Sequence, residues 1–122
     1  MIKEFWDLEV WRRGRELIRG IYCQTKLFPR QETYGLTDQL RRAAVSICAN
    51  IAEGFERFYP KDKIRFYYQS RGSLSECKSH ILIGEALGYI NGDTANKLID
   101  ECNIIGKMLN GLISSLANHI KN

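Results

Sequence analysis

Apolar residues recur three or four positions apart along most of the chain, and this spacing predicts four helices. The pattern is clearest near the C-terminus, where apolar positions alternate between steps of three and four. A seam of this kind is typical of helices that pack in an antiparallel bundle. Its members are Ala95, Leu98, Cys102, Ile105, Leu109, Leu112 and Leu116. The four predicted helices span about residues 7–27, 33–55, 60–87 and 93–119.

The residues between these periodic segments are typical of helix ends and short turns. Pro60 suits the first turn of the third helix, and Gly88 suits its C-terminal end. Asp7 and Asp93 are expected to cap the first and fourth helices. Because the loops are short, we expect one domain over residues 1–122, folded as an all-α, up-down-up-down antiparallel four-helix bundle.

The second predicted helix carries two seams side by side. Its apolar seam consists mostly of small residues, namely Leu40, Ala43, Ala44, Ile47 and Ile51. The neighbouring polar seam is either solvated or partly buried and hydrogen-bonded, in which case it would determine how helices or subunits dock. We expect Asn50 to be substantially buried and hydrogen-bonded, close to Trp11 and Tyr67. The candidate structural or interface residues of this seam are Ser46, Asn50, Glu53 and Gly54.

Several separated motifs of the chain resemble one protein family. They are RAAVSICANIAEGFER in the second helix, LEVW near the start, FP before that helix, and RGSLSE followed by LGYI after it. Together they resemble the bacterial four-helix-bundle proteins encoded within intervening sequences of 23S ribosomal RNA genes, to which the accessory variability protein of diversity-generating retroelements is similar. Arg71, the first residue of RGSLSE, joins the candidate interface residues.

This resemblance implies a homopentameric ring and a role in nucleic-acid binding, and it supplies no catalytic residues. Cys48 stands where the family usually has proline. The resemblance therefore implies a second helix without the kink that proline would cause.

Basic residues are concentrated in the first part of the chain. The formal net charge is +4, but residues 1–78 contain fifteen Lys or Arg against ten Asp or Glu, and residues 79–122 contain three against four. Such a face is either merely solvated or contacts phosphates without reading bases. The candidate nucleic-acid-binding residues are Arg12, Arg13, Arg15, Arg19, Arg41, Arg42, Lys61, Lys63 and Arg65.

Aromatic residues gather around the predicted turn between the second and third helices. Exposed rings there could stack on unpaired bases, although we expect most of them to plug the end of the bundle. They are Phe55, Phe58, Tyr59, Phe66, Tyr67 and Tyr68.

Enzymatic and metal chemistry have little support in the sequence. The chain has two histidines, no phosphate-binding glycine loop and no serine beside an oriented base, so we expect no enzyme. Helix register places Cys23, Cys77, Cys102 and His80 in one layer. Without CxxC or HxxxH spacing, we expect free thiols and no metal or other cofactor.

With no run of about 18 apolar residues and no charged-then-apolar leader, we expect a cytoplasmic protein without membrane contact.

Two functions remain open. The first function is that of a non-enzymatic, homo-oligomeric protein that binds RNA or another nucleic acid through basic helix faces. The alternative is an oligomeric scaffold that docks a protein partner, in which the charge is incidental.

Overall fold

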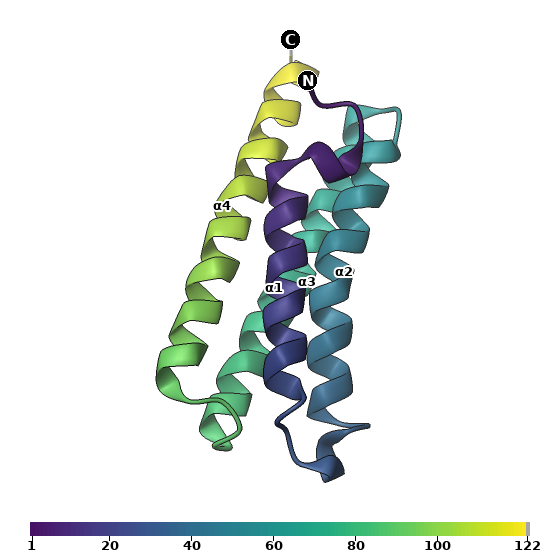
Figure 1. The fold of residues 1–122 in the computed structure, drawn as a ribbon. Coiled ribbons are helices and arrows are strands. Elements are labelled where there is room, and N and C mark those ends of the chain that lie inside the picture. The colour runs from purple at the N-terminus through teal and green to yellow at the C-terminus, as the bar shows by residue number, and fades with distance from the viewer. Residues whose placement is uncertain (122) are drawn as a thin grey trace.

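The computed structural model describes residues 1–121 and contains four α-helices and two short 3₁₀ turns, with no strand in that range. The helices lie side by side (Figure 1). The α1–α2 and α3–α4 links lie at one end, and the α2–α3 link lies at the other end with both termini (Figure 1). The all-α class and the four helices are therefore confirmed. The elements are η1 (Phe5–Asp7), α1 (Glu9–Thr25), η2 (Arg30–Glu32), α2 (Leu36–Glu56), α3 (Pro60–Ala86) and α4 (Gly92–Lys121).

The predicted caps of the first and fourth helices are wrong. Asp7 belongs to the turn η1, where its carboxylate accepts hydrogen bonds from the backbone N–H groups of Lys3 and Glu4 at 3.2 and 3.1 Å. At α4, Asn91 takes the place expected for Asp93, and its Oδ1 accepts a hydrogen bond from the Thr94 backbone N–H at 2.8 Å. Helix spacing does not distinguish between neighbouring polar residues, because the cap is the one whose side chain reaches a free N–H.

Both ends of α3 agree with the sequence. Pro60 is the first residue of the helix, where its missing N–H leaves no hydrogen bond unmade. Gly88 follows the helix with φ of +79°, a left-handed conformation that favours glycine. The Tyr89 N–H then donates to the Gly84 carbonyl at 2.9 Å, which satisfies a carbonyl at the end of α3. The chain can therefore turn sharply into α4.

The core lies between the four helices and uses the seams that the spacing predicts. Every residue of the apolar seam of α2 is at most 2% exposed. In α1 the buried apolar residues of the core are Val10, Leu17 and Ile21. From α4, the fully buried members of the heptad seam are Ala95, Cys102, Ile105 and Leu109. Within residues 1–121, no helix has both the length and the apolar character needed to cross a bilayer.

Helices α2 and α3 approach closely because small residues lie in their contact. A Cβ on Gly54 would lie 2.8 Å from Cε1 of Tyr67 and 3.1 Å from Cβ of Phe66, and both aromatic residues are buried. One turn further along α3, the hydroxyl of Ser70 donates to the Ile47 carbonyl at 2.8 Å. Gly54 therefore allows α3 to pack directly on the backbone of α2.

Helices α1 and α2 have a similar close contact at Cys48. The Cys48 thiol donates to the Trp11 carbonyl at 3.5 Å, and a Cβ on Gly14 would lie 2.5 Å from the sulfur. Burial raises the pKa of Cys48 to about 12, so the thiol stays neutral near pH 7. Helix α2 continues through this position from Leu36 to Glu56. Cys48 is thus a packing residue between two helices.

We predict that Gly54→Ala destabilises the protein by about 1–3 kcal/mol, because its methyl group would overlap the buried ring of Tyr67. Gly72 provides a matched control, because it lies exposed on α3 and a Cβ there would meet no heavy atom within 4 Å. Gly72→Ala should stabilise by about 0.5–1 kcal/mol through helix propensity. Urea unfolding followed by circular dichroism measures both changes. Equal effects at the two positions would contradict the close α2–α3 contact.

Candidate nucleic-acid interface

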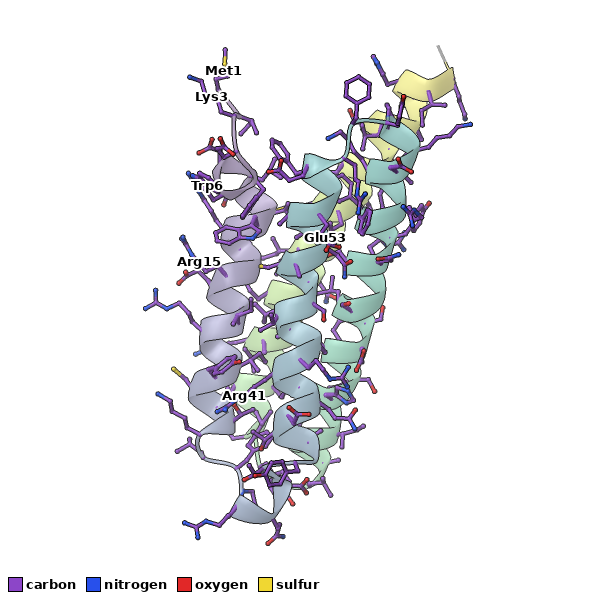
Figure 2. All side chains as sticks on the ribbon, turned by 90° about the vertical axis from the view of Figure 1, so that its right-hand side faces the viewer. Met1, Lys3, Trp6, Arg15, Arg41 and Glu53 are labelled. Carbon is purple, nitrogen blue, oxygen red and sulfur yellow. The ribbon has the colours of Figure 1, made fainter. Side chains whose placement is uncertain are left out.

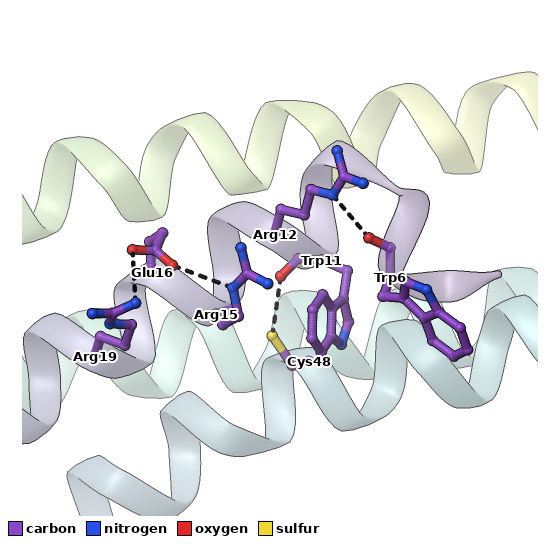
Figure 3. A network of polar contacts seen from close by, with 7 residues as sticks. All are labelled: Trp6, Trp11, Arg12, Arg15, Glu16, Arg19 and Cys48. Carbon is purple, nitrogen blue, oxygen red and sulfur yellow. Dashed lines mark hydrogen bonds and ion pairs between the residues drawn. The ribbon is translucent and has the colours of Figure 1, made fainter. Parts of the chain in front are cut away.

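Arg15 and Arg19 lie on an exposed flank of α1 and share one carboxylate. Arg15 Nε lies 3.2 Å from Glu16 Oε2, and Arg19 Nη1 lies 3.9 Å from Glu16 Oε1 (Figure 3). The guanidinium of Arg15 also lies 5.5 Å from the centroid of a Trp11 ring. Both arginine side chains are at least half exposed. This flank can therefore contact an anion, although Glu16 already balances part of its charge.

Arg12 secures the N-terminal turn η1 against α1. Its Nε donates to the Trp6 carbonyl at 2.9 Å (Figure 3). Its Nη2 lies 3.8 Å from Asp7 Oδ1. Half of the Arg12 side chain remains exposed. Arg12 thus has a structural contact as well as a solvent-facing charge.

Arg13 points to a different side of α1 and connects it to α4. Its Nη1 donates to Glu101 Oε1 at 3.2 Å, and its Nε lies 3.4 Å from Glu9 Oε1. The hydrogen bond to Glu101, together with the charges of both carboxylates, raises the pKa of Arg13. The basic excess of α1 is therefore partly balanced, because Asp7, Glu9 and Glu101 all lie within 4 Å of its arginines. Exposed ion pairs of this kind contribute only about 0–1 kcal/mol each, so a phosphate can displace a carboxylate.

The neighbours Arg41 and Arg42 have different roles. Arg41 is half-buried, its Nε donates to Thr25 Oγ1 at 2.7 Å, and its guanidinium lies 4.4 Å from the centroid of the Tyr22 ring. It lies at the seam between α1 and α2 (Figure 2). Arg42 is exposed, and no ion pair within residues 1–121 involves it. Of these two arginines, Arg42 is therefore the more accessible to an anion.

The basic residues at the start of α3 form a separate group. Lys63 Nζ donates to the Phe55 carbonyl at 2.6 Å at the end of α2, and burial lowers the pKa of Lys63. Arg65 Nη2 lies 3.8 Å from Asp62 Oδ1, whereas Lys61 is exposed. These residues lie in the first turns of α3, next to the α2–α3 link, whereas Arg41 and Arg42 lie near the other end of α2. The nine predicted basic residues therefore do not form one continuous site.

The polar seam of α2 is only partly buried in this chain. Asn50 is half-buried, and its Nδ2 donates to the Ser46 carbonyl of its own helix at 2.9 Å. The predicted bond to Trp11 or Tyr67 is wrong, because register along the bundle gives the height of a residue and not the direction of its side chain. Glu53 is exposed beside α3 (Figure 2). Within the seam, Gly54 is the buried member with a packing role.

Three of the six aromatic residues near the α2–α3 link are exposed, which contradicts the expectation that most of them plug the bundle. Phe66 and Tyr67 are buried, and burial raises the pKa of Tyr67. Phe58, Tyr59 and Tyr68 are 85%, 64% and 52% exposed.

In the predicted layer of three thiols and His80, two members lie in contact. Cys77 and Cys102 are both fully buried, and a hydrogen bond between them, together with burial, raises the pKa of Cys77. Cys23 is exposed, and His80 Nε2 lies 3.2 Å from Glu76 Oε2. Among residues 1–121, no group of three His, Cys, Asp or Glu side chains is arranged to hold a metal ion.

Two surface hollows lie along α4 and were not anticipated as sites. One has a volume of about 320 Å³, and its apolar lining includes Leu8, Val10, Met108 and Leu112. The other, which we call the α3–α4 groove, has a volume of about 390 Å³ and a polar lining. Its polar residues are Arg71, Ser75, Lys78, Asn103, Lys107 and Asn110. Antiparallel register in the sequence pairs these positions, but side-chain size and direction decide whether a hollow forms between them.

The fold and surface define a class of small, all-α, four-helix proteins with exposed basic flanks. The family model for the 23S rRNA-intervening sequence protein matches residues 6–111, and the chain belongs to this family. The match confirms the family resemblance seen in the sequence motifs.

A crystal structure of a protein with unknown function from the S23 ribosomal protein family of Bacteroides thetaiotaomicron is similar to this chain, with a TM-score of 0.78 and 22% sequence identity. The similarity covers 85% of this chain and 97% of that one. At this identity the similarity supports the shared fold alone. No curated protein matches the chain.

Proposed function

We propose that this protein is a non-enzymatic, RNA-binding oligomer that contacts phosphates through basic helix faces in the cytoplasm. The main support is the flank formed by Arg12, Arg15 and Arg19, whose side chains are each at least half exposed. Their spacing of three and four residues places them along about 10 Å of one helix side. A flank of this length can contact two or three successive phosphates.

The expected binding has little base specificity. Arginines on the outer side of a helix position a phosphate backbone, whereas sequence is read by side chains that enter a groove and contact base edges. The name of the family refers to an intervening sequence of 23S rRNA, which makes RNA the preferred ligand for this proposal. Binding through phosphates should weaken steeply with added salt.

We also propose that the helices form an up-down-up-down antiparallel bundle and that the chain assembles into a homopentameric ring. The number five comes from the family resemblance. Support for assembly comes from apolar side chains that the single chain leaves accessible. Met108 and Leu112 line the apolar hollow with Leu8, while Tyr34 is 95% exposed and Val45 is 43% exposed. A ring would multiply the positive charge that one copy presents to RNA.

The alternative function is an oligomeric scaffold that docks a protein partner. The same exposed apolar residues support it, because a docking surface needs apolar area but does not need a net charge. Salt separates the two functions, since contacts between apolar surfaces do not weaken steeply as ionic strength rises.

We predict that the triple variant Arg15→Gln, Arg19→Gln, Arg42→Gln binds structured RNA more weakly and by a similar factor for different sequences. Arg12 is left in place because it holds the turn η1. Losing up to three phosphate contacts should reduce the slope of log K against log salt by about 2. Fluorescence anisotropy at several salt concentrations measures this slope, and circular dichroism checks helicity. If the wild-type protein binds neither structured RNA nor DNA at low salt, the scaffold function replaces this proposal.

The oligomer gives a second prediction. Light scattering at micromolar concentration should report a mass near five times that of the 14.1 kDa chain. The result should not change with modest salt, because the proposed contacts are apolar. A mass of one chain would contradict the ring.

A further inference from the structure

The α3–α4 groove lies where two antiparallel helices leave a gap between their side chains. Lys78 Nζ donates to Asn103 Oδ1 across the gap at 3.3 Å. Deeper in the contact, a Cβ on Gly106 would lie 3.4 Å from Cδ2 of Leu74. These two contacts define one register, in which Lys78 is level with Asn103 and Leu74 is level with Gly106. The same register brings Arg71 level with Asn110 at the other end of the groove.

The groove is hollow because its floor is made of small or recessed residues. Gly106 has no side chain, and Cys102 and Leu74 are buried with exposures of 0% and 4%. The walls are longer polar side chains that rise on either side of this floor. The result is an open trough of about 390 Å³ with an apolar base and polar rims.

The charge of the groove is positive and is not neutralised within the described chain. Arg71, Lys78 and Lys107 line it, and none of the described residues that line it carries a carboxylate. Within residues 1–121, no ion pair involves any of these three cations. The four arginines of α1, by contrast, all have a carboxylate within 4 Å. The groove is therefore better prepared than α1 to accept an anion.

The length of the groove favours an extended anion with several charges. Arg71 and Lys78 are seven residues apart on α3, which separates them by about 10 Å along the helix. Lys107 lies on the opposite wall, and Ser75 and Asn110 add hydrogen-bond donors. A single carboxylate could contact only one of these cations at a time, whereas a chain of phosphates can contact all three.

An exposed aromatic ring lies next to the groove. Tyr68 is 52% exposed, and the Arg71 guanidinium lies 5.4 Å from the centroid of its ring. A positive trough that follows the backbone, combined with a ring on which a base can stack, is typical of proteins that bind single-stranded nucleic acid.

We propose that the α3–α4 groove binds the phosphates of an unpaired RNA segment through Arg71, Lys78 and Lys107, and that Tyr68 stacks on one base. The choice of RNA rests on the function proposed above, but the phosphate site does not. Inorganic polyphosphate offers the same kind of phosphoryl oxygens on a shorter repeat and should enter the same groove. The groove is thus a second contact region, on a different pair of helices from the α1 flank.

The test compares three variants that have each lost the same charge. The groove variant is Arg71→Gln, Lys78→Gln, Lys107→Gln. The comparison variant, called the α1 variant, is the triple variant given above, Arg15→Gln, Arg19→Gln, Arg42→Gln, which keeps Arg12 because it holds the turn η1. The control is Lys3→Gln, Lys26→Gln, Lys97→Gln, whose residues are exposed and lie outside both regions. The probe is a single-stranded oligouridylate of about 12 nucleotides. Binding of inorganic tripolyphosphate to the wild-type protein is followed separately by NMR.

The groove variant should bind the oligouridylate about tenfold more weakly or worse, with the control within about threefold of wild type. Tyr68→Ala should weaken binding without changing the salt slope, because stacking releases no counterions. Tripolyphosphate should shift the backbone amide signals of Lys78, Asn103 and Lys107 in the wild-type protein.

Several results would overturn the groove as a site. An equal loss in the groove variant and the control would show that only net charge matters. Loss in the α1 variant alone, without tripolyphosphate shifts in the groove, would leave the proposed RNA function standing and remove the groove from it. If wild type binds no RNA but tripolyphosphate shifts the groove amides, the phosphate site is supported and the proposed RNA function fails.

Discussion

The close contact between α2 and α3 at Gly54 determines how α3 is rotated about its own axis. Because Gly54 has no side chain, Phe66 and Tyr67 pack directly on α2, and Ser70 hydrogen-bonds the Ile47 carbonyl. Residues three to four positions apart on the flank beside these must then face α4. Arg71 and Lys78 are on that flank, and both line the α3–α4 groove. A packing constraint in the core thus places two cations at the surface.

The cations of this protein differ in what surrounds them. On α1, carboxylates from η1, α1 and α4 approach the arginines, and these pairs are partly or largely exposed. On α2, Arg41 is held by Thr25 and Tyr22 at a helix seam. The groove cations have no such carboxylate within the described chain. The local environment of each cation, more than the net charge of +4, therefore indicates where an anion would bind.

The sequence predicts the fold well because helix period and core seams follow directly from residue type. The four helices, the buried seam from Leu40 to Ile51 and the end of α3 at Gly88 all agree with it. Features that depend on side-chain direction are predicted less well. The Asn50 side chain forms a hydrogen bond within its own helix, and Arg13 forms one with Glu101 of α4.

The candidate site shows the same division. Spacing predicts that Arg15 and Arg19 lie on one flank of α1, but it does not reveal that both contact Glu16. The α3–α4 groove depends on small residues such as Gly106 beneath longer ones, and its cations come from two helices. Arg71 and Lys78 lie in the basic first part of the chain, whereas Lys107 lies in residues 79–122, which carry a slight acidic excess. Charge counting along the chain therefore does not bring these three cations together.

Lysine footprinting of the protein with and without RNA tests most directly whether the rotation of α3 builds a phosphate site. The wild-type protein is acetylated briefly at near-neutral pH, and the modified lysines are quantified by mass spectrometry. The account predicts that single-stranded RNA protects Lys78 and Lys107 and leaves Lys26 and Lys97 unchanged. Bound RNA that leaves Lys78 and Lys107 as reactive as in the free protein would contradict it.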